Sequence, residues 1–297
     1  MNDKRPPRVA GFTFVRNAVL YDYPVLEAIQ SILPVCDYFV VAVGRSEDET
    51  LDLVRSLNDP RLHIVETVWD ETLRTGGRVL AEETNKAFDA IPTEYDWCFY
   101  IQADECVHEQ DLPIIQDAMS RWLCDVQTEG LLFQYRHFYG SYDYIGVSRR
   151  WYRREVRIIR NDKRIRSWRD AQGFRINGRK LKVRLLDAYI YHYGWVKPPE
   201  AQQRKQRHFQ RWWHSDEVVQ RLVGNAPSYM YDDTEPLERF QGTHPAVIQP
   251  RIQALNWYFN VDPARARWPW KDRLSRWIER HTGWRPGEYK NYYLLRN

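Results

Sequence analysis

The segment WCFYIQADE at residues 97–105 changes from large apolar side chains to polar and acidic ones with no turn residue between them. Its uninterrupted apolar run indicates a strand that is covered on both faces, as in a parallel sheet. Ligands of open α/β sheets bind beyond the carboxyl ends of such strands. We therefore expect Asp104 and Glu105 to lie on the rim of a sheet, where a site would form.

Strand-like and helix-like segments alternate through the first half of the chain. Apolar, β-branched runs predict strands at 9–15, 38–43, 62–68 and 97–103, and apolar stripes predict helices at 25–33, 51–57 and 78–91. Ser46 and Glu49 have the spacing of a capping box at the start of the second helix. A helix is then expected at 112–123, and strands at 130–138 and 187–195. This order favours an α/β fold with a mostly parallel, doubly wound sheet flanked by helices.

The two halves of the chain differ in charge. Residues 1–148 hold 12 Lys and Arg against 25 Asp and Glu, whereas residues 149–297 hold 32 against 15. Residues 149–169 alone contain ten basic and two acidic residues, interleaved with apolar and aromatic ones in a pattern that suggests a β-hairpin. The division indicates an acidic half that tolerates a metal and a basic half that faces an anion. After Pro198 and Pro199 we expect a polar helix at 200–222 and an irregular helical extension to residue 297.

Composition limits where the protein works. No apolar run approaches the ~20 residues of a membrane-spanning helix, and the N-terminal MNDKRPPR lacks the apolar segment of a signal peptide. Four cysteines without a C-x-x-C pair are too few for a disulfide scaffold. We therefore expect free thiols and a cytoplasmic protein.

Four segments, taken in order, resemble the landmarks of a family 2 glycosyltransferase with a GT-A fold. They are GFTFVRNA at 11–18, VVAVGRSEDET at 40–50, RVLAEETNKAFDAI at 78–91 and YIQADE at 100–105. The resemblance implies a Rossmann-like nucleotide-sugar-binding and catalytic domain at 1–198. A helical, Trp- and Arg-rich extension at 199–297 would then serve the acceptor side or docking. The implied reaction is sugar transfer, with inversion, from a nucleotide-sugar donor to a hydroxyl of a saccharide, lipid-linked or protein acceptor.

In that family a D-x-D motif binds the divalent metal that bridges the donor's diphosphate, and Gln102-Ala103-Asp104 stands in its place here. Mg²⁺ and Mn²⁺ take hard oxygen ligands, so the resemblance implies Asp104 as a ligand of Mn²⁺ or Mg²⁺. Gln102 would hydrogen-bond the ribose or a phosphate. Many GT-A enzymes use a late His as a further metal ligand, a position that His192 matches. The alternatives are a solvated strand end or helix cap for Asp104 and aromatic packing for His192.

The resemblance implies that six further residues contact the nucleotide: Thr13, Phe14, Arg16, Asn17, Asp48 and Arg78. Core packing is the alternative for Phe14, and helix capping or a solvated surface is the alternative for Asp48 and Arg78. The family usually has a base-reading Asp before its S-x-D-x-T signature, whereas this chain has Val43, Gly44 and Arg45. A donor other than a UDP-sugar is therefore favoured.

An inverting transfer needs a carboxylate that deprotonates the acceptor hydroxyl as it attacks the anomeric carbon. Asp170 is the first acid after the basic block, where the catalytic E-D pair of the family would fall, although Arg169 replaces the Glu. The resemblance implies Asp170 as the catalytic base. A salt-bridged Asp in an Arg-rich segment is the alternative.

Other functions stay open at this stage. Arg interleaved with Trp and Tyr at 149–169 is also typical of a nucleic-acid surface. Val156, Ile158 and Ile159 alternate too little for an open stacking platform, and we expect no nucleic-acid partner. A nucleotidyltransferase uses a similar sheet and metal, but the Gly-rich first loop is absent. Gln102 also admits a degenerate transferase kept as a binding module. Residues 268–284, WPWKDRLSRWIERHTGW, fit an amphipathic helix that contacts the inner face of a membrane peripherally or docks on the protein.

Overall fold

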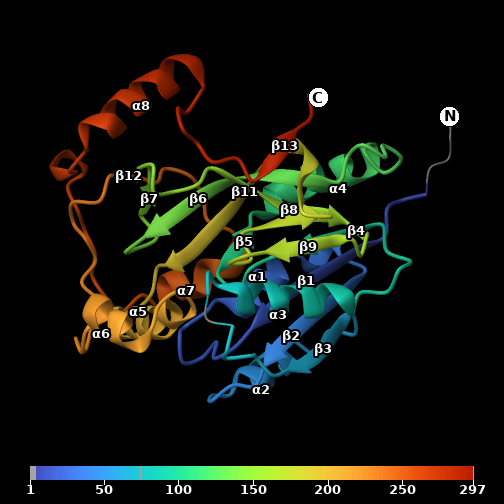
Figure 1. The fold of residues 1–297 in the computed structure, drawn as a ribbon, viewed down its shortest axis with the longest axis horizontal. Coiled ribbons are helices and arrows are strands. Elements are labelled where there is room, and N and C mark those ends of the chain that lie inside the picture. Colours follow the sequence, from blue (N-terminus) through green and yellow to red (C-terminus); the bar gives the residue numbers. More distant parts are fainter. Residues whose placement is uncertain (1–4, 74, 297) are drawn as a thin grey trace.

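The computed structural model describes residues 5–73 and 75–296, in which helices pack on a large curled sheet (Figure 1). The strands are β1 (Val9–Val15), β2 (Tyr38–Gly44), β3 (Leu62–Thr67), β4 (Trp97–Tyr100), β5 (Glu105–Val107), β6 (Gly130–Tyr139), β7 (Tyr144–Gly146), β8 (Arg154–Arg160), β9 (Ile165–Trp168), β10 (Gly173–Ile176), β11 (Arg179–Trp195), β12 (Leu237–Arg239) and β13 (Tyr292–Leu294). The helices are α1 (Val25–Ile32), α2 (Thr50–Arg55), α3 (Arg78–Asp89), α4 (Leu112–Arg121), α5 (Pro199–Phe209), α6 (Asp216–Val223), α7 (Gln249–Gln253) and α8 (Trp270–Thr282).

The first half of the sheet is parallel. Its strands lie in the order β3, β2, β1, β4, and each neighbouring pair runs in the same direction. Helices α1 and α4 pack on one face of these strands, and α3 packs on the other. The expected α/β fold class is confirmed, because the uninterrupted apolar runs are strands that helices cover on both faces.

The second half of the sheet is mixed. β8 lies between β4 and β6 and is antiparallel to both, whereas β6 runs parallel to β11. β9 pairs with β10 and not with β8. The expected hairpin within 149–169 is therefore wrong. β8 is an interior strand because its Val156, Ile158 and Ile159 side chains are buried in the core.

Much of the positive charge at 149–169 is paired within the protein. Arg157 is fully buried, and the guanidinium of Arg160 donates to backbone carbonyls at 2.5–3.0 Å. Arg153 pairs with two glutamates of the C-terminal segment, and Arg166 pairs with Asp89. Cations committed to carboxylates and carbonyls of the protein are not offered to phosphates. The nucleic-acid alternative loses its main support.

The segment from residue 199 carries helices, as expected, but the single helix expected at 200–222 is wrong: the chain forms α5 and α6 there, with a break between them. The segment also carries two strands that the sequence did not predict. β12 pairs with β7, and β13 extends the main sheet by pairing in parallel with β11. A domain boundary at residue 198 stays a prediction. Among the described residues, no helix combines the length and apolar character needed to cross a bilayer.

A buried ion pair lies just behind the end of β4. Nε and Nη2 of Arg157 each donate to one carboxylate oxygen of Glu105 at 2.8 Å, and both side chains are fully buried. The hydroxyl of Tyr135 and the backbone N–H of Gln102 donate to the same carboxylate at 2.8 and 3.1 Å. The expectation that Glu105 lies on the exposed rim is wrong, because an arginine of β8 neutralises it inside the protein.

We expect Arg157→Met to lower the free energy of unfolding by about 3–5 kcal/mol, because it leaves the Glu105 carboxylate buried without its counter-charge. Urea unfolding measures this loss. Arg121→Met, which breaks the exposed pair with Asp117 on α4, is the matched control and should cost less than about 1 kcal/mol. Equal losses in the two variants would show that the buried pair does not stabilise the fold.

Glu155 on β8 should make stability depend on pH. Burial raises the pKa of this carboxyl to about 8, from an ordinary value of 4.5, despite the nearby charge of Arg157. The native protein keeps this proton over a pH range in which the unfolded chain has lost it, so stability falls as the pH rises through that range. Glu155→Gln retains an acceptor for Gln172 and removes the titration. We expect the variant to gain stability relative to wild type between about pH 5 and about pH 8 in urea unfolding; identical pH profiles would contradict this.

Candidate functional site

A cleft of about 400 Å³ opens beyond the carboxyl ends of β1 and β4. The turn between β9 and β10, the end of β11, and α5 with the residues after it form its other walls. Six of the predicted site residues line it: Phe14, Arg16, Gln102, Asp104, Asp170 and His192. They come from segments far apart in the chain, and they meet at the rim where α/β sheets bind ligands.

Backbone pairing places Asp104 beside His192. Strand β5 runs antiparallel to β11, which sets Glu105 opposite His192, and the N–H of Tyr193 donates to the carbonyl of Asp104 at 2.8 Å. As a result, Oδ1 of Asp104 lies 3.7 Å from Nε2 of His192. Both side chains line the cleft, and both are largely buried.

Lys205 of α5 completes this corner of the cleft, and the sequence reasoning missed it. Its Nζ donates to Oδ2 of Asp104 at 3.1 Å and to the carbonyl of Gly194 at 2.9 Å. Burial is the largest single influence on the pKa of Asp104 and opposes ionisation, but Lys205, His192 and Lys197 together outweigh it and hold the pKa of this carboxyl below its ordinary value; Lys205 contributes most of the three. No motif identifies Lys205, because it is one of several basic residues on a polar helix and only the fold selects it.

A chain of hydrogen bonds fixes the protonation of His192. Nε2 of His137 lies 2.8 Å from the carbonyl oxygen of Tyr152, which can only accept, so Nε2 carries the proton. Burial lowers the pKa of both His137 and His192, so both rings are neutral near pH 7. Nδ1 of His137 is then an acceptor, and Nδ1–H of His192 donates to it at 3.0 Å. This leaves the lone pair of His192 Nε2 toward Asp104.

A carboxylate oxygen and an imidazole lone pair 3.7 Å apart fit two ligands of one divalent cation, since such ligands lie about 2.1 Å from Mg²⁺. Gly194 keeps the adjoining space open: a Cβ on this residue would stand 2.7 Å from both Oδ2 of Asp104 and Nε2 of His192. In the part of the chain that the structure describes, no group of three or more His, Cys, Asp or Glu is arranged to hold a metal. Asp104 and His192 could therefore hold a cation only together with oxygens from another ligand.

Asp170 lies on a constrained turn across the cleft. Its neighbours Arg169 and Ala171 have φ angles of 54° and 59°, a left-handed conformation that is uncommon outside glycine. Gln102 Nε2 donates to the carbonyl of Ala171 at 3.3 Å, and Arg157 Nη1 donates to that of Gln172 at 2.9 Å. Burial raises the pKa of Asp170, in contrast to Asp104. The two carboxyls of the cleft thus differ in proton affinity.

Aromatic side chains form the wall of the cleft at the end of β1. The rings of Phe14 and Trp212 each lie 5.8 Å from that of Trp69, and His208 lies 5.4 Å from Trp212. Trp69 packs on the backbone at Gly44, where a Cβ would come within 2.3 Å of the indole nitrogen. At the end of β2, where the family usually has an acidic residue and this chain has Gly44, the indole ring of Trp69 covers the backbone.

Four predicted site residues lie outside this lining. Thr13 is fully buried in β1, and Arg78 is exposed on the first turn of α3. Asn17 Oδ1 accepts from a backbone N–H of the loop after β2 at 2.8 Å, and Asp48 Oδ2 accepts from one of the loop after β1 at 2.7 Å. Asn17 and Asp48 thus brace two loops against each other at the edge of the site.

The capping box expected at Ser46 and Glu49 is wrong. Helix α2 begins at Thr50, and the Ser46 hydroxyl instead accepts from the N–H of Asn17 at 3.0 Å and donates to the Gly44 carbonyl at 2.8 Å. Ser46 is not available to cap the helix, because its hydroxyl fastens the loop that follows β1.

No protein-family model matches the chain, and no curated protein matches it significantly. The chain is similar to solved structures. One is S. aureus TarS 1–349 in complex with UDP, at 14% identity and a TM-score of 0.39 over 73% of this chain and 69% of that one; in a longer TarS structure the match spans 38% of that chain. A second is the mannosyltransferase PcManGT from Pyrobaculum calidifontis in complex with GDP-Man and Mn²⁺, at 23% identity and a TM-score of 0.34 over 45% and 39% of the two chains. A third is glucosyl-3-phosphoglycerate synthase from Mycobacterium tuberculosis in complex with Mn²⁺, UDP and phosphoglyceric acid, at 15% identity and a TM-score of 0.29 over 45% of this chain and 43% of that one.

We expect Gly194→Ala to abolish Mn²⁺ binding at this corner, because the added methyl group enters the space between Asp104 and His192. Isothermal titration of the purified protein with Mn²⁺ alone measures the effect. The metal-free melting temperature should fall as well, because the methyl group would stand 2.7 Å from both side chains and force them to shift, so the titration is made at a temperature at which the variant is still folded. Unchanged Mn²⁺ affinity would show that the ion, if bound, does not lie between these two side chains.

Proposed function

We propose that this chain is a glycosyltransferase that moves a sugar from a nucleotide-sugar donor to an acceptor hydroxyl, with inversion and with Mn²⁺ or Mg²⁺. The observation that carries the proposal is that one cleft holds a two-ligand cation corner, Asp104 with His192, and a separate carboxyl of raised pKa, Asp170. The acceptor is a saccharide, lipid-linked or protein hydroxyl. All four cysteines are free thiols, which suits the cytoplasm as the compartment.

The charges of the cleft suit a diphosphate. Arg16, Arg150 and Lys205 line it, against the carboxyls Asp104 and Asp170. Asp104 and His192 would hold the divalent ion, which when bound offsets the charge that develops on the leaving diphosphate. Lys205 keeps Asp104 ionised before the donor arrives and adds a cation where the diphosphate oxygens would lie.

In this proposal Asp170 acts as the base. In the proposed transfer the acceptor hydroxyl gives its proton to the Asp170 carboxylate while its oxygen forms a bond to the anomeric carbon. The bond from that carbon to the diphosphate oxygen breaks, and its electron pair leaves with the diphosphate. The raised pKa of Asp170 favours proton uptake, and the turn that Gln102 and Arg157 hold fixes its direction.

The aromatic wall supports a stacked nucleobase. Phe14 is half-buried and offers a ring surface in the cleft, and the buried Trp69 and Trp212 pack beside it. Stacking of a base on such a ring contributes about 1–3 kcal/mol. Trp69 covers the end of β2, so no carboxylate reads the base from that position.

We expect Asp104→Asn and Asp170→Asn to separate donor binding from turnover. Nucleoside diphosphates and nucleotide-sugars, tested with Mn²⁺ or with a chelator, should raise the melting temperature of wild type only when the metal is present. Asp104→Asn should lose this stabilisation, because the charged metal ligand is gone. Asp170→Asn should retain it and lose turnover by about 10²-fold or more, because the proton acceptor is gone.

Asp117→Asn, an exposed carboxyl on α4, is the matched control and should behave as wild type in both assays. Stabilisation by no diphosphate, or by oligonucleotides instead, would overturn the transferase proposal. Full turnover in Asp170→Asn would overturn only the assignment of the base.

A further inference from the structure

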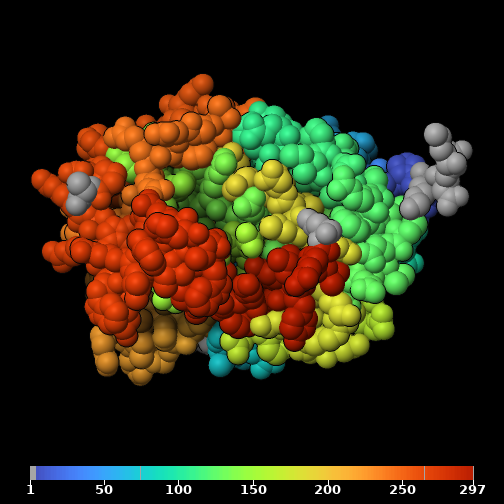
Figure 2. All heavy atoms as spheres, turned by 90° about the horizontal axis from the view of Figure 1, so that it is seen from above, coloured from blue at the N-terminus to red at the C-terminus, as the bar shows by residue number. Residues whose placement is uncertain are grey.

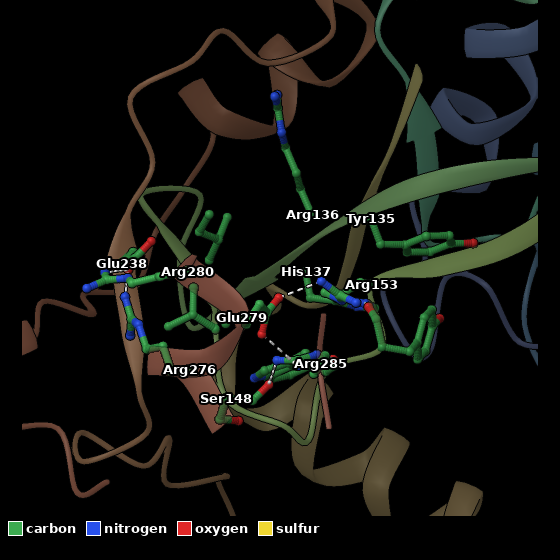
Figure 3. A pocket seen from close by; sticks show the side chains of 15 residues that line it. Tyr135, Arg136, His137, Ser148, Arg153, Glu238, Arg276, Glu279, Arg280 and Arg285 are labelled. Atoms are coloured by element: carbon green, nitrogen blue, oxygen red, sulfur yellow. Dashed lines mark hydrogen bonds and ion pairs between the residues drawn. The ribbon is translucent and has the colours of Figure 1, made fainter. Parts of the chain in front are cut away.

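An ordinary surface helix packs its apolar stripe against the core. Helix α8 has the opposite orientation, with a polar face toward the protein and an apolar face toward solvent. Only Ser275 of this helix is buried, and the side chains beside it on the inner face are charged. Glu279 pairs with Arg153 at 2.6 Å and with Arg285 at 3.1 Å, and Arg276 pairs with Glu238. Figure 3 shows Glu279 between Arg153 and Arg285 in the crevice, and Arg276 beside Glu238 in a separate group to the left. Ion pairs on its inner face therefore hold α8 to the protein.

The opposite face of α8 is apolar and exposed. Trp270, Leu274 and Trp277 recur at spacings of four and three residues, which places them on one side of the helix. Their exposed fractions are 70%, 51% and 60%, and Trp284, just beyond the helix, is 59% exposed. We call these four residues the tryptophan face. Figure 1 shows α8 at the outer edge of the molecule, and Figure 2 shows the last part of the chain, in red, spread over one side of the surface.

Cations surround the tryptophan face. Residues 265–285 contain seven Lys and Arg against two Asp and Glu; Arg276, Arg285 and Glu279 belong to the inner ion pairs, which leaves five Lys and Arg against one Asp. Lys271, Arg273 and Arg280 are exposed among the tryptophans. A shallow groove beside Trp277 is lined by Arg273, Arg280 and His281. This groove offers cations to an anionic group that lies against the indole rings.

We propose that the tryptophan face of α8 binds the surface of an anionic phospholipid bilayer. Indole rings prefer the boundary between headgroups and acyl chains, and Lys or Arg beside them attract anionic headgroups. Charge complementarity favours an anionic bilayer, because Lys271, Arg273 and Arg280 flank the exposed indole rings and Asp272 is the one acid of the helix that is not in an inner ion pair. The polar inner face remains fixed to the protein through its ion pairs. This proposal does not rest on the transferase function.

Co-sedimentation with vesicles tests it. The full chain should bind vesicles of mixed phosphatidylglycerol and phosphatidylcholine, and bind vesicles of phosphatidylcholine alone at least about tenfold more weakly. Added salt should weaken the binding to the anionic vesicles, because it screens the attraction. Trp270→Ser with Trp277→Ser, and separately Lys271→Gln with Arg273→Gln, should each lower binding by about tenfold or more.

Tyr258→Ser, at an aromatic residue that is 85% exposed outside α8, is the matched control and should bind as wild type. Because all the altered side chains are exposed, melting temperatures should not change, and neither should donor-induced stabilisation in the absence of vesicles. The vesicle result is therefore independent of the donor-site result. Absence of vesicle binding, or binding that the tryptophan variants do not weaken, would overturn the proposal. So would a self-association in sedimentation velocity that the same variants abolish, because a second copy would then cover the face.

Discussion

The fully buried pair of Glu105 and Arg157 is the interaction on which the site depends. Arg157 reaches from β8 to the carboxylate that follows Asp104, and its remaining nitrogen donates to the carbonyl of Gln172. One guanidinium therefore fixes both the turn that presents Asp104 and the turn that presents Asp170. Burying two charges is costly, and here the bidentate geometry with added donors from Tyr135 and Gln102 offsets the cost. Once formed, such a pair resists displacement because moving either partner exposes an uncompensated charge.

Behind this pair, the pairing of β5 with β11 sets the distance between the two halves of the cation corner. His192 stands opposite Glu105, so its ring reaches the same space as Asp104, and Gly194 leaves that space open. Lys205 closes the corner from α5, which belongs to the segment after the sheet. The Lys205 ammonium already donates a hydrogen bond to one oxygen of the Asp104 carboxylate. An incoming divalent ion would share Asp104 with Lys205 or displace it, which makes the helix part of the site.

Sequence patterns predicted the strands and the acidic residue that follows one of them, but they did not predict contacts between residues far apart in the chain. The parallel strands, and Asp104 at the end of one of them, follow from apolar runs that end in acids. The fully buried Arg157 was not predictable, because arginine in a basic block resembles a solvated surface until an interior strand pairs it with Glu105. Lys205 carries no motif. Ser46 and Glu49 have the spacing of a capping box, but the Ser46 hydroxyl instead accepts a hydrogen bond from the N–H of Asn17, in the loop after β1.

Helix α8 shows the same limit from another side. The periodicity of Trp270, Leu274 and Trp277 establishes that the helix is amphipathic, but a periodic pattern has no direction and does not say which face meets the protein. That choice is made by Arg153 and Arg285, whose charges sit in a crevice and hold Glu279 inward. Once Glu279 faces inward, helical geometry turns the indole rings outward. The indole rings are therefore exposed because an ion-pair network on the opposite side of the helix sets its orientation. The core is complete without them, and the apolar face remains accessible to a partner.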